Sequence, residues 1–236
     1  MDIIECIHTR RSVRKFLDIP VEWDKIAQII SAGRAAPSAG NLQNYRFIVV
    51  EDEDMRKQIA DACLQQQWIG KAPAILLVVD VPDLQKRHYG LRGEKLYSIQ
   101  NCAAVIENML LTAHALGLGA CWVGAFEEEM LLRILKITGT ARPQAVIPIG
   151  YPNETPPEPP RAELYSQVFI ETYGNRIRDL DATISRYSGV WEREAKAGKK
   201  YVEKKAAKLH ERIKPALIRL REKIKKKFKK KESVTN

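Results

Sequence analysis

The stretch with the clearest chemical potential is residues 10–16, which read RRSVRKF. It gathers four cationic side chains and one hydroxyl group within seven residues that end in an apolar Phe. Guanidinium groups fork onto phosphate oxygens and a serine hydroxyl adds a donor, so this pattern could form an anion pocket. The segment lies between a predicted helix and a predicted loop, where phosphate sites often form. A solvated run of charge is the alternative interpretation of the segment by itself.

Two later stretches combine turn residues and glycines: PSAGNLQ at residues 37–43 and GLGACWVG at residues 117–124. In the first, Pro fixes one φ angle, Gly frees another, and Ser and Asn offer hydrogen bonds, which is typical of a loop. The second does not match the dinucleotide fingerprint G-x-G-x-x-G, because it follows a predicted helix and enters a predicted strand. It is either a helix C-cap with a tight strand, or a backbone close under a flat ring, where only Gly avoids collision.

Neither the histidines nor the cysteines form a recognisable catalytic or metal-binding set. His114 falls within an apolar helical pattern, where a hydrogen-bonded core residue is the favoured interpretation. The four cysteines contain no CxxC pair, which argues against a zinc or iron–sulfur site and predicts reduced thiols in a cytoplasmic protein. The sequence therefore predicts no metal ion.

Hydrophobic periodicity predicts the elements that must position these stretches. The ranges expected to be helical are 2–9, 20–33, 54–67, 98–116 and 127–135, and those expected to be strands are 46–50, 74–79, 119–124 and 144–150. Residues 98–116 are nearly apolar on all sides, which indicates a central, buried helix. Helices and strands that intermix without regular βαβ alternation predict an α+β fold, a mixed sheet flanked by helices.

Residues 81–97 are polar, contain Gly and have no clear periodicity. They are predicted to form a lid or a substrate loop, with Tyr89, Arg92 and Tyr97 as candidate substrate contacts. The prolines that follow residue 151 predict an extended crossing segment that ends at Arg161.

Charge is distributed unevenly along the 236 residues. Residues 1–175 carry 18 Lys and Arg against 21 Asp and Glu, a net charge of −3, whereas residues 176–236 carry 21 against 8, a net charge of +13. The sequence therefore predicts a mildly acidic domain over residues 1–175 and a basic extension over residues 176–236. No apolar run approaches the ~18–20 residues of a membrane span, and the N-terminal residues do not match a signal peptide.

Three motifs in this order resemble the FMN-dependent nitroreductase family. They are RRSVRKF at residues 10–16, APSAGNLQ at residues 36–43 and AHALGLGACWVGAF at residues 113–126, and Arg161 follows the proline-rich crossing as in that family. Their order and approximate spacing match across residues 1–175. The resemblance implies a three-layer α/β/α sandwich with a mixed, mainly antiparallel sheet, and an obligate homodimer with two FMN sites at the subunit interface.

The resemblance also implies roles for the residues at matching positions. The cofactor-binding residues that it implies are Arg10, Arg11, Ser12, Arg14, Pro37, Ser38, Ala39, Asn41, Gln43, Gln67, Trp122, Val123, Gly124 and Arg161. The residues from 10 to 14 would hold the FMN phosphate and ribityl chain, and Arg161 would complete the phosphate clamp. The residues from 37 to 43 would come from the partner subunit.

Two further parts of the flavin site follow from the resemblance. The backbone of residues 122–124 would pass beside the isoalloxazine ring, with an amide of Val123 or Gly124 bonding to the N5 edge. Gln65, Gln66 and Gln67 lie where family members often place a polar side chain near the pyrimidine edge, and the sequence does not choose among the three.

The implied function is an NAD(P)H-dependent FMN oxidoreductase. Hydride would pass from NADH or NADPH to the flavin and on to an electron-poor acceptor such as a nitro compound, a quinone or a flavin. The nicotinamide and the acceptor would occupy one pocket in turn, which gives ping-pong kinetics. No side chain is expected to be catalytic, because the cofactor does the chemistry. Flavin fragmentation and reductive dehalogenation, which related enzymes perform, are alternatives. Asn101 stands where many relatives have Asp, and is expected to affect helix packing.

Residues 176–236 lie beyond the resemblance and contain a helical stripe. Apolar residues recur at steps of three or four from Val202 to Phe228, Lys and Arg fill the other faces, and Pro215 should kink or split the helix. The stripe could pack on the dimer, bind an anionic membrane surface, which would make the protein peripheral, or contact nucleic acid. Its aliphatic character favours membrane slightly over nucleic acid. A non-catalytic module that binds through this tail is therefore an alternative function.

Overall fold

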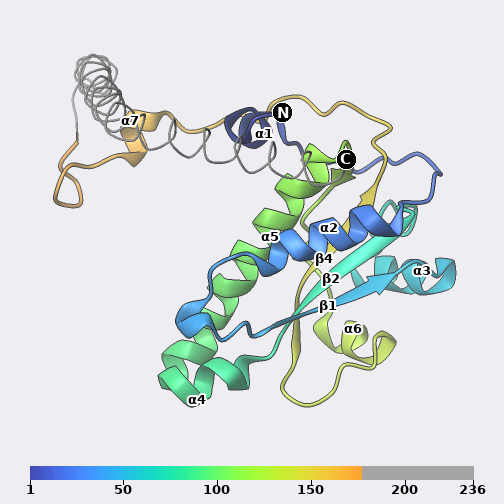
Figure 1. Cartoon of the computed structure of the whole chain (residues 1–236), viewed down its shortest axis with the longest axis horizontal. Coiled ribbons are helices and arrows are strands. Elements are labelled where there is room, and N and C mark those ends of the chain that lie inside the picture. The colour runs from blue at the N-terminus through green and yellow to red at the C-terminus, as the bar shows by residue number, and fades with distance from the viewer. Residues whose placement is uncertain (177–236) are drawn as a thin grey trace, which may run out of the picture. The chain divides into compact units, whose positions relative to one another are not determined.

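The computed structural model describes residues 1–176, and Figure 1 shows their path. These residues belong to two compact units, the first of which is Met1–Pro159 and the second of which begins at Pro160. The helical stripe and Pro215 of the predicted basic extension lie outside the described residues. Within the part of the chain that is described, no helix is both long enough and apolar enough to span a membrane.

The first unit combines helices with a sheet. Its helices are α1 (Ile3–Thr9), α2 (Trp23–Arg34), α3 (Glu53–Ala62), α4 (Pro82–Arg92), α5 (Ser98–Ala115) and α6 (Glu128–Ile134), with a 3-10 turn η1 (Ala39–Asn41) and a π-helical turn η2 (Gly93–Tyr97). Its strands are β1 (Tyr45–Val50), β2 (Ala74–Asp80), β3 (Gly119–Ala120) and β4 (Arg142–Gly150). The described residues of the second unit include the short helix α7 (Leu164–Gln167).

The sheet has the strand order β1-β2-β4-β3, and each neighbouring pair is antiparallel. A single parallel bridge joins Ser12 to Ala120 at the β3 edge. All seven residues of β2 are buried, because both faces of this central strand are covered. Successive side chains of a strand point to opposite faces, so β2 contributes to two separate cores.

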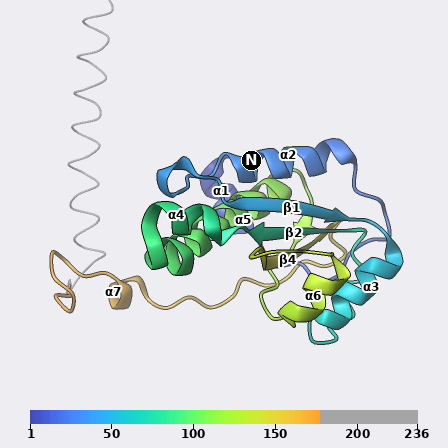
Figure 2. The ribbon, with the colours of Figure 1, turned by 90° about the horizontal axis from the view of Figure 1, so that it is seen from below.

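Helices cover the two faces of the sheet, as Figure 2 shows for α2 on one side and α3 and α6 on the other. Leu76 and Val78 pack with apolar side chains of α2 and α5. Ile75 and Leu77 pack with side chains of α3 and α6, including Leu131. The expected α+β fold, a three-layer α/β/α sandwich with a mainly antiparallel sheet, is confirmed.

The end of α5 is set by Gly117, whose φ is +76°. The Leu118 N–H donates to the Ala113 carbonyl at 2.8 Å and the Gly117 N–H to the His114 carbonyl at 3.0 Å, the bond pair of a Schellman cap. Glycine adopts this left-handed conformation without a Cβ penalty. The predicted helix C-cap is therefore confirmed, and the chain turns directly into β3.

Three predicted elements differ from the structure. Residues 81–97 are not a loop, because they form α4 and η2 before α5 begins. The strand expected over residues 119–124 is limited to β3, with an isolated bridge at Val123. The helix expected over residues 54–67 ends at Ala62, where the backbone of Leu64 and Gln65 turns to positive φ.

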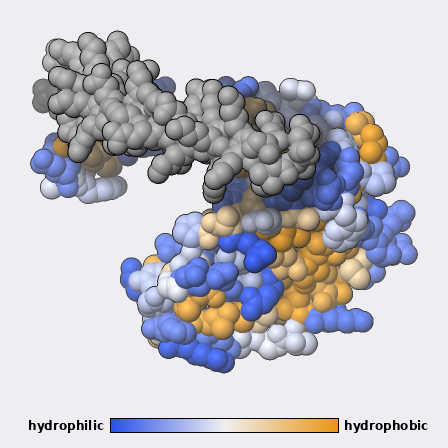
Figure 3. Space-filling model, viewed as in Figure 1, coloured by the Kyte–Doolittle hydropathy of each residue, from blue (hydrophilic) through white to orange (hydrophobic). Residues whose placement is uncertain are grey.

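Large apolar side chains also lie on the surface of the described residues. Figure 3 shows apolar residues gathered on the face that is viewed in Figure 1. In α1, Ile3, Ile4 and Ile7 are 63%, 61% and 49% exposed, and Trp23 at the start of α2 is 58% exposed. The three isoleucines of α1 form an exposed apolar surface of a kind typical of sites that bind another protein chain.

Candidate functional site

Residues 10–16 form an arm that lies along β3. The backbone becomes extended at Arg10, directly after α1. Ser12 pairs with Ala120 in the parallel bridge, and the Val13 N–H donates to the Ala120 carbonyl at 3.1 Å. This pairing brings the cationic arm together with the glycine-flanked stretch, so two of the three sequence motifs are neighbours in one chain.

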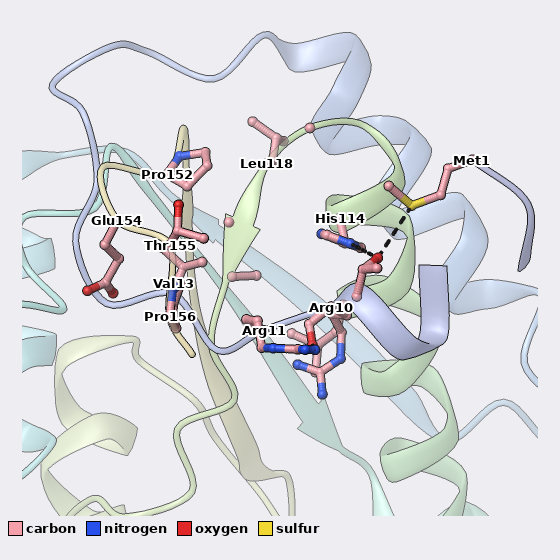
Figure 4. A pocket seen from close by; sticks show the side chains of 15 residues that line it. Met1, Arg10, Arg11, Val13, His114, Leu118, Pro152, Glu154, Thr155 and Pro156 are labelled. Carbon is pink, nitrogen blue, oxygen red and sulfur yellow. Dashed lines mark hydrogen bonds between the residues drawn. The ribbon is translucent and has the colours of Figure 1, made fainter. Parts of the chain in front are cut away.

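A cavity of about 300 Å³ opens beside this arm (Figure 4). Arg10 and Arg11 line it together with the backbone from Gly117 to Ala120. Arg10 pairs with Glu107 at 3.8 Å and Arg11 with Glu158 at 3.7 Å, and their side chains are 21% and 22% exposed. These ion pairs are longer than charge-assisted hydrogen bonds, so they leave donors of both guanidinium groups available to an anion, although Arg11 Nη1 also donates to the His8 and Arg10 carbonyls at 2.7 and 2.9 Å.

His114 lines the same cavity from α5. Its Nε2 lies 2.8 Å from Thr9 Oγ1, a hydrogen bond that ties α1 to the end of α5. Burial lowers the pKa of His114, and the charges of Arg10 and Arg11 lower it further. A neutral, hydrogen-bonded imidazole follows, which agrees with the structural interpretation of this residue.

Arg14 contacts a different set of residues. Its guanidinium carbon lies 5.9 Å from the centroid of the Trp68 ring, within the range of a cation–π contact. The backbone N–H groups of Arg14 and Lys15 both donate to Glu154 Oε1, at 2.6 Å and 3.1 Å. One carboxylate oxygen therefore fixes two successive amides of the arm. Trp68 and Glu154 were not predicted from the sequence, because they are remote from the arm along the chain.

Ser12 and Arg14 also lie near the thiol of Cys121, which is 3% exposed. Burial raises the pKa of this thiol, whereas Arg14 and the Ser12 hydroxyl lower it. The thiol is protonated at neutral pH under the dominant effect of burial. Cys121 therefore packs in the core behind the arm.

Residues 122–124 continue from β3 along the neighbouring strand β4. The Val123 N–H donates to the Val146 carbonyl at 2.9 Å, and the Val123 carbonyl accepts from the Val146 N–H at 3.0 Å. Val123 is buried, whereas Trp122 is 41% exposed and Gly124 lies on the surface. Because β4 uses the Val123 amide, the Gly124 amide is the better candidate for a bond to a ligand.

Two glycines of this stretch differ in what surrounds them. A Cβ at Gly119 would lie 2.8 Å from the side chain of Val13, so the close approach of the arm requires glycine. A Cβ at Gly124 would meet only Trp122 Nε1 at 3.8 Å, which is ordinary contact. Packing within the chain therefore explains Gly119 but leaves space above Gly124.

The loop of residues 37–43 forms the 3-10 turn η1. Gly40, Asn41 and Gln43 have φ angles of +60°, +55° and +47°. Pro37, Asn41 and Gln43 are exposed, and Ser38 and Ala39 are half-buried. The loop thus displays polar groups at the surface from a backbone that is rarely adopted by residues other than glycine.

The loop contacts α5 near its start, whereas α1, which precedes the arm, contacts α5 near its end. The Ala39 N–H donates to Asn101 near the start of α5, whereas α1 bonds to Leu111 and His114 near its end. Ten or more residues of helix separate the contacts of α1 from that of the loop, which corresponds to roughly 15 Å or more at 1.5 Å per residue, and Arg10 of the arm reaches back to Glu107 in the middle of α5. One chain therefore keeps the third motif apart from the other two.

The candidate substrate residues lie on helices. Tyr89 is in α4 and its ring packs edge-on against that of Tyr97 in η2, with centroids 5.4 Å apart. Arg92 Nε donates to the Tyr97 hydroxyl at 3.0 Å. Tyr89 is 42% exposed, and its hydroxyl lies beside Gly40, where a Cβ would be 2.6 Å away. The structure thus brings Tyr89 to the loop.

The three consecutive glutamines differ in their contacts. Gln67 Nε2 donates to Asp61 Oδ1 at 2.7 Å, and Gln66 Nε2 donates to the Cys63 carbonyl at 2.9 Å. Gln65 is exposed and has a φ of +58°. Gln67 also lines a cleft with Phe16 of the arm. A role of Gln67 beside a flavin stays a prediction.

Arg161 belongs to the second unit, in which it is exposed. Its predicted place in the phosphate clamp therefore stays a prediction. Among residues 1–176, the side chains of His, Cys, Asp and Glu form no group of three or more that could hold a metal ion.

The chain matches a known protein family. The model of the nitroreductase family matches residues 7–86 and 64–151 of this chain. A protein of Archaeoglobus fulgidus, provisionally named NADH dehydrogenase/NAD(P)H nitroreductase, is 36% identical over 157 residues, which are 65% of this chain and 87% of that protein.

Two further relatives extend the comparison. An FMN reductase (NAD(P)H) of Bacillus subtilis is 26% identical over 205 residues, covering 79% of this chain and 82% of that protein. The crystal structure of a nitroreductase family protein from Clostridium novyi is 28% identical in sequence and superposes with a TM-score of 0.61, covering 76% of this chain and 98% of that chain.

Proposed function

The chain belongs to the nitroreductase family, and from this premise we propose that it is an FMN-dependent oxidoreductase. It would oxidise NADH or NADPH and reduce an electron-poor acceptor such as a nitro compound, a quinone or a flavin. The names of its relatives, which include NAD(P)H nitroreductase and FMN reductase, support this reaction class.

The observation that carries the proposal is the pairing of the arm with β3. Through the Ser12–Ala120 bridge, the guanidinium groups of the arm lie beside the backbone that leads to Gly124. A phosphate group needs guanidinium groups as donors, and a flat ring needs a backbone with no side chain above it. The space above Gly124 and the long ion pairs of Arg10 and Arg11 fit both parts of FMN.

Within this proposal, Arg10, Arg11, Ser12 and Arg14 hold the phosphate and ribityl chain, and Arg161 completes the clamp. Trp68 limits the directions that the Arg14 guanidinium group can take, because the ring covers one of its faces. Glu154 fixes the backbone from which Arg14 extends. The Gly124 amide is then available to donate to the N5 edge of the ring.

FMN held by these residues would supply the redox chemistry between the nicotinamide and the acceptor. The residues of the chain bind and orient, so the proposal assigns no acid, base or nucleophile to them. The two co-substrates use one pocket in turn, which gives ping-pong kinetics. Tyr89, whose hydroxyl lies beside Gly40 of the loop, would contact whichever co-substrate occupies that pocket.

We further propose that the active species is a homodimer. The separation of the loop from the arm along α5 supports this, because residues 37–43 could then reach the flavin of the partner subunit. The exposed Ile3, Ile4, Ile7 and Trp23 provide apolar surface for such an interface. Sedimentation of a monomer at micromolar concentration would contradict the dimer.

The experiment that tests the proposed function is flavin binding followed by anaerobic reduction. The purified chain, incubated with FMN and desalted, is expected to retain the flavin and to be bleached rapidly by NADH or NADPH in a stopped-flow instrument. A chain that takes up no FMN, or whose bound flavin neither nicotinamide reduces, would refute the proposal. An acceptor screen with both nicotinamides then identifies the second substrate.

The charge of residues 176–236, +13 against −3 for residues 1–175, supports a second proposal. We propose that these residues form a separate basic extension that binds an anionic membrane surface. Co-sedimentation with vesicles of anionic lipid is expected for the full chain and not for a chain without residues 180–236. Stronger co-sedimentation with DNA across a salt series would favour nucleic acid instead.

A further inference from the structure

Five polar side chains are buried together in the first unit. They are Asn44, Asp80, Gln85, Ser98 and Asn101, and none is more than 6% exposed. They come from four places: the residue before β1, the end of β2, the middle of α4 and the first turn of α5. Buried polar groups lower stability unless they are hydrogen-bonded, so a cluster of this kind indicates a network with a fixed arrangement.

Asn44 is the centre of this network. Its Nδ2 donates to Asp80 Oδ1 at 2.6 Å and to the Ser98 carbonyl at 3.2 Å. Its Oδ1 accepts from Asn101 Nδ2 at 2.7 Å and from Gln85 Nε2 at 3.3 Å. The amide thus uses both of its protons and both of its lone pairs. The orientations of Asn101 and Gln85 are therefore determined by the core.

Asn101 and Gln85 carry the network outward to one residue of the loop. Asn101 Oδ1 accepts from the Ala39 N–H at 3.0 Å, and Gln85 Nε2 donates to the Ala39 carbonyl at 3.1 Å. Both polar backbone groups of Ala39 are held in this way, one by α5 and the other by α4. Ser38 lies just before this clamped residue and Asn41 two residues after it.

The backbone angles near Ala39 explain why this residue needs hydrogen bonds from both Asn101 and Gln85. Gly40, Asn41 and Gln43 all have φ between +47° and +60°. Residues other than glycine rarely adopt such angles, and they persist where surrounding contacts over-determine them. The Ser38 hydroxyl adds one such contact by accepting from the Gln43 N–H at 3.2 Å.

We infer that Asn101 and Gln85 are positioning residues for the flavin-contacting loop, because their bonds to Ala39 fix where Ser38 and Asn41 present their polar groups. This inference rests on the proposed function, in which the loop reaches a flavin. It assigns Asn101 a role beyond the helix packing expected from the sequence. It also links the loop to Tyr89, which lies one turn beyond Gln85 on α4.

Asn101→Leu tests the inference against Asn108→Leu as a matched control. Asn108 lies about two turns further along α5, and its Nδ2 donates to the Ala32 carbonyl at 3.1 Å. Both variants therefore remove one side-chain amide that bonds to backbone from the same helix. Only the first variant touches the loop.

Three quantities are measured on the full chain: the midpoint of thermal unfolding, the amide exchange rate of residues 39–41 without flavin, and the dissociation constant of FMN by fluorescence quenching. Both variants are expected to lower the unfolding midpoint. Only Asn101→Leu is expected to speed exchange at Ala39 and to weaken FMN binding by about tenfold, since a displaced loop loses a hydrogen bond to the ligand.

Unchanged exchange at Ala39 in Asn101→Leu would overturn the inference, and so would equal FMN affinities in the two variants. If Asn101→Leu does not fold, Gln85→Met replaces it, because that side chain keeps its length and loses its donor. FMN uptake by the unaltered chain tests the proposed function separately. If that uptake fails, exchange at Ala39 still decides whether Asn101 holds the loop.

Discussion

The arm of residues 10–16 and the loop of residues 37–43 present polar groups in opposite ways. The arm carries Arg10 and Arg11, which are 21% and 22% exposed and form ion pairs of 3.8 and 3.7 Å with carboxylates that are more exposed. The loop is held from beneath by neutral amides that are at most 6% exposed. The charged side chains of the arm can therefore change with little effect on the core, whereas the network that holds Ala39 is part of the core.

The two arrangements also differ in energy. Exposed ion pairs contribute only about 0–1 kcal/mol each, because water and salt screen them. A buried polar group that loses its partner costs about 1–3 kcal/mol, and more if it is charged. We therefore expect substitutions in the arm to change ligand binding and substitutions beneath the loop to change stability first.

Asn44→Leu is expected to have the largest effect. It leaves Asp80, Gln85 and Asn101 without their shared partner, so the free energy of unfolding should fall by about 3–5 kcal/mol. Urea unfolding followed by circular dichroism measures the change. A loss below about 1 kcal/mol would mean that the network rearranges and that the loop is not held by the core.

The double variant Arg10→Gln, Arg14→Gln should affect binding instead. We expect the dissociation constant of FMN to rise by about 10–100-fold, since two charge-assisted contacts to the phosphate are lost. The free energy of unfolding should change by less than about 1 kcal/mol. The unaltered chain should bind FMN more weakly as salt increases, and the variant should respond less.

Arg133→Gln with Lys136→Gln is the control for this variant. It removes the same charge from exposed positions at the end of α6 and just after it. Titration of FMN into both proteins at low and high salt gives the comparison. Equal loss of affinity in the control would mean that net charge, rather than the arm, attracts the phosphate.

The sequence predicted the arm and the fold because their signals are local. The apolar pattern of residues 98–116 is continuous, and Gly117 marks the helix end by its own conformational freedom. The Arg and Ser residues of the arm lie within five positions of one another, so their shared chemistry is evident from the sequence itself. The strands of the core likewise follow from β-branched, apolar runs.

The sequence did not predict α4 or the network, because neither has a local signal. Residues 82–92 lack a hydrophobic periodicity, and the buried face of α4 contains the polar Gln85. Its partners are Ala39 of the loop and Asn44 just before β1, both more than forty residues earlier in the chain. Glu154 and Trp68 were missed for the same reason. Long-range hydrogen bonds decide these positions, and a single sequence does not reveal them.

Gly40→Ala compares the loop with an unconstrained turn. Residue 40 has a φ of +60°, so any Cβ there should lower the free energy of unfolding by about 1 kcal/mol. Gly139→Ala should cost the same, because residue 139 has a φ of +71°, and its Cβ would have no atom within 4 Å. Only the Cβ at residue 40 would push the Tyr89 hydroxyl away. We expect the KM of the acceptor to change in Gly40→Ala alone. Equal kinetics in both variants would remove Tyr89 from the site.

The smallest expected effect is the dependence of stability on pH through the buried carboxyl group of Asp80. Burial raises the pKa of its carboxyl group above the ordinary 3.8, opposed by hydrogen bonds from Asn44 and Ser98 and by the charge of Arg142. A raised pKa means that the folded state binds the proton more tightly than the unfolded state. The stability that this group contributes is therefore full below pH 3.8 and is lost as pH rises through the folded pKa.

Asp80→Asn removes this titration and keeps an oxygen for Asn44. The difference in unfolding free energy between the variant and the unaltered chain should move in favour of the variant as pH rises from about 4 to 7. A flat difference for Asp80→Asn would mean that the core beneath the loop does not sense this charge. A difference that changes with pH would show that the network beneath the loop responds to pH through stability, whereas the arm responds to salt through FMN binding.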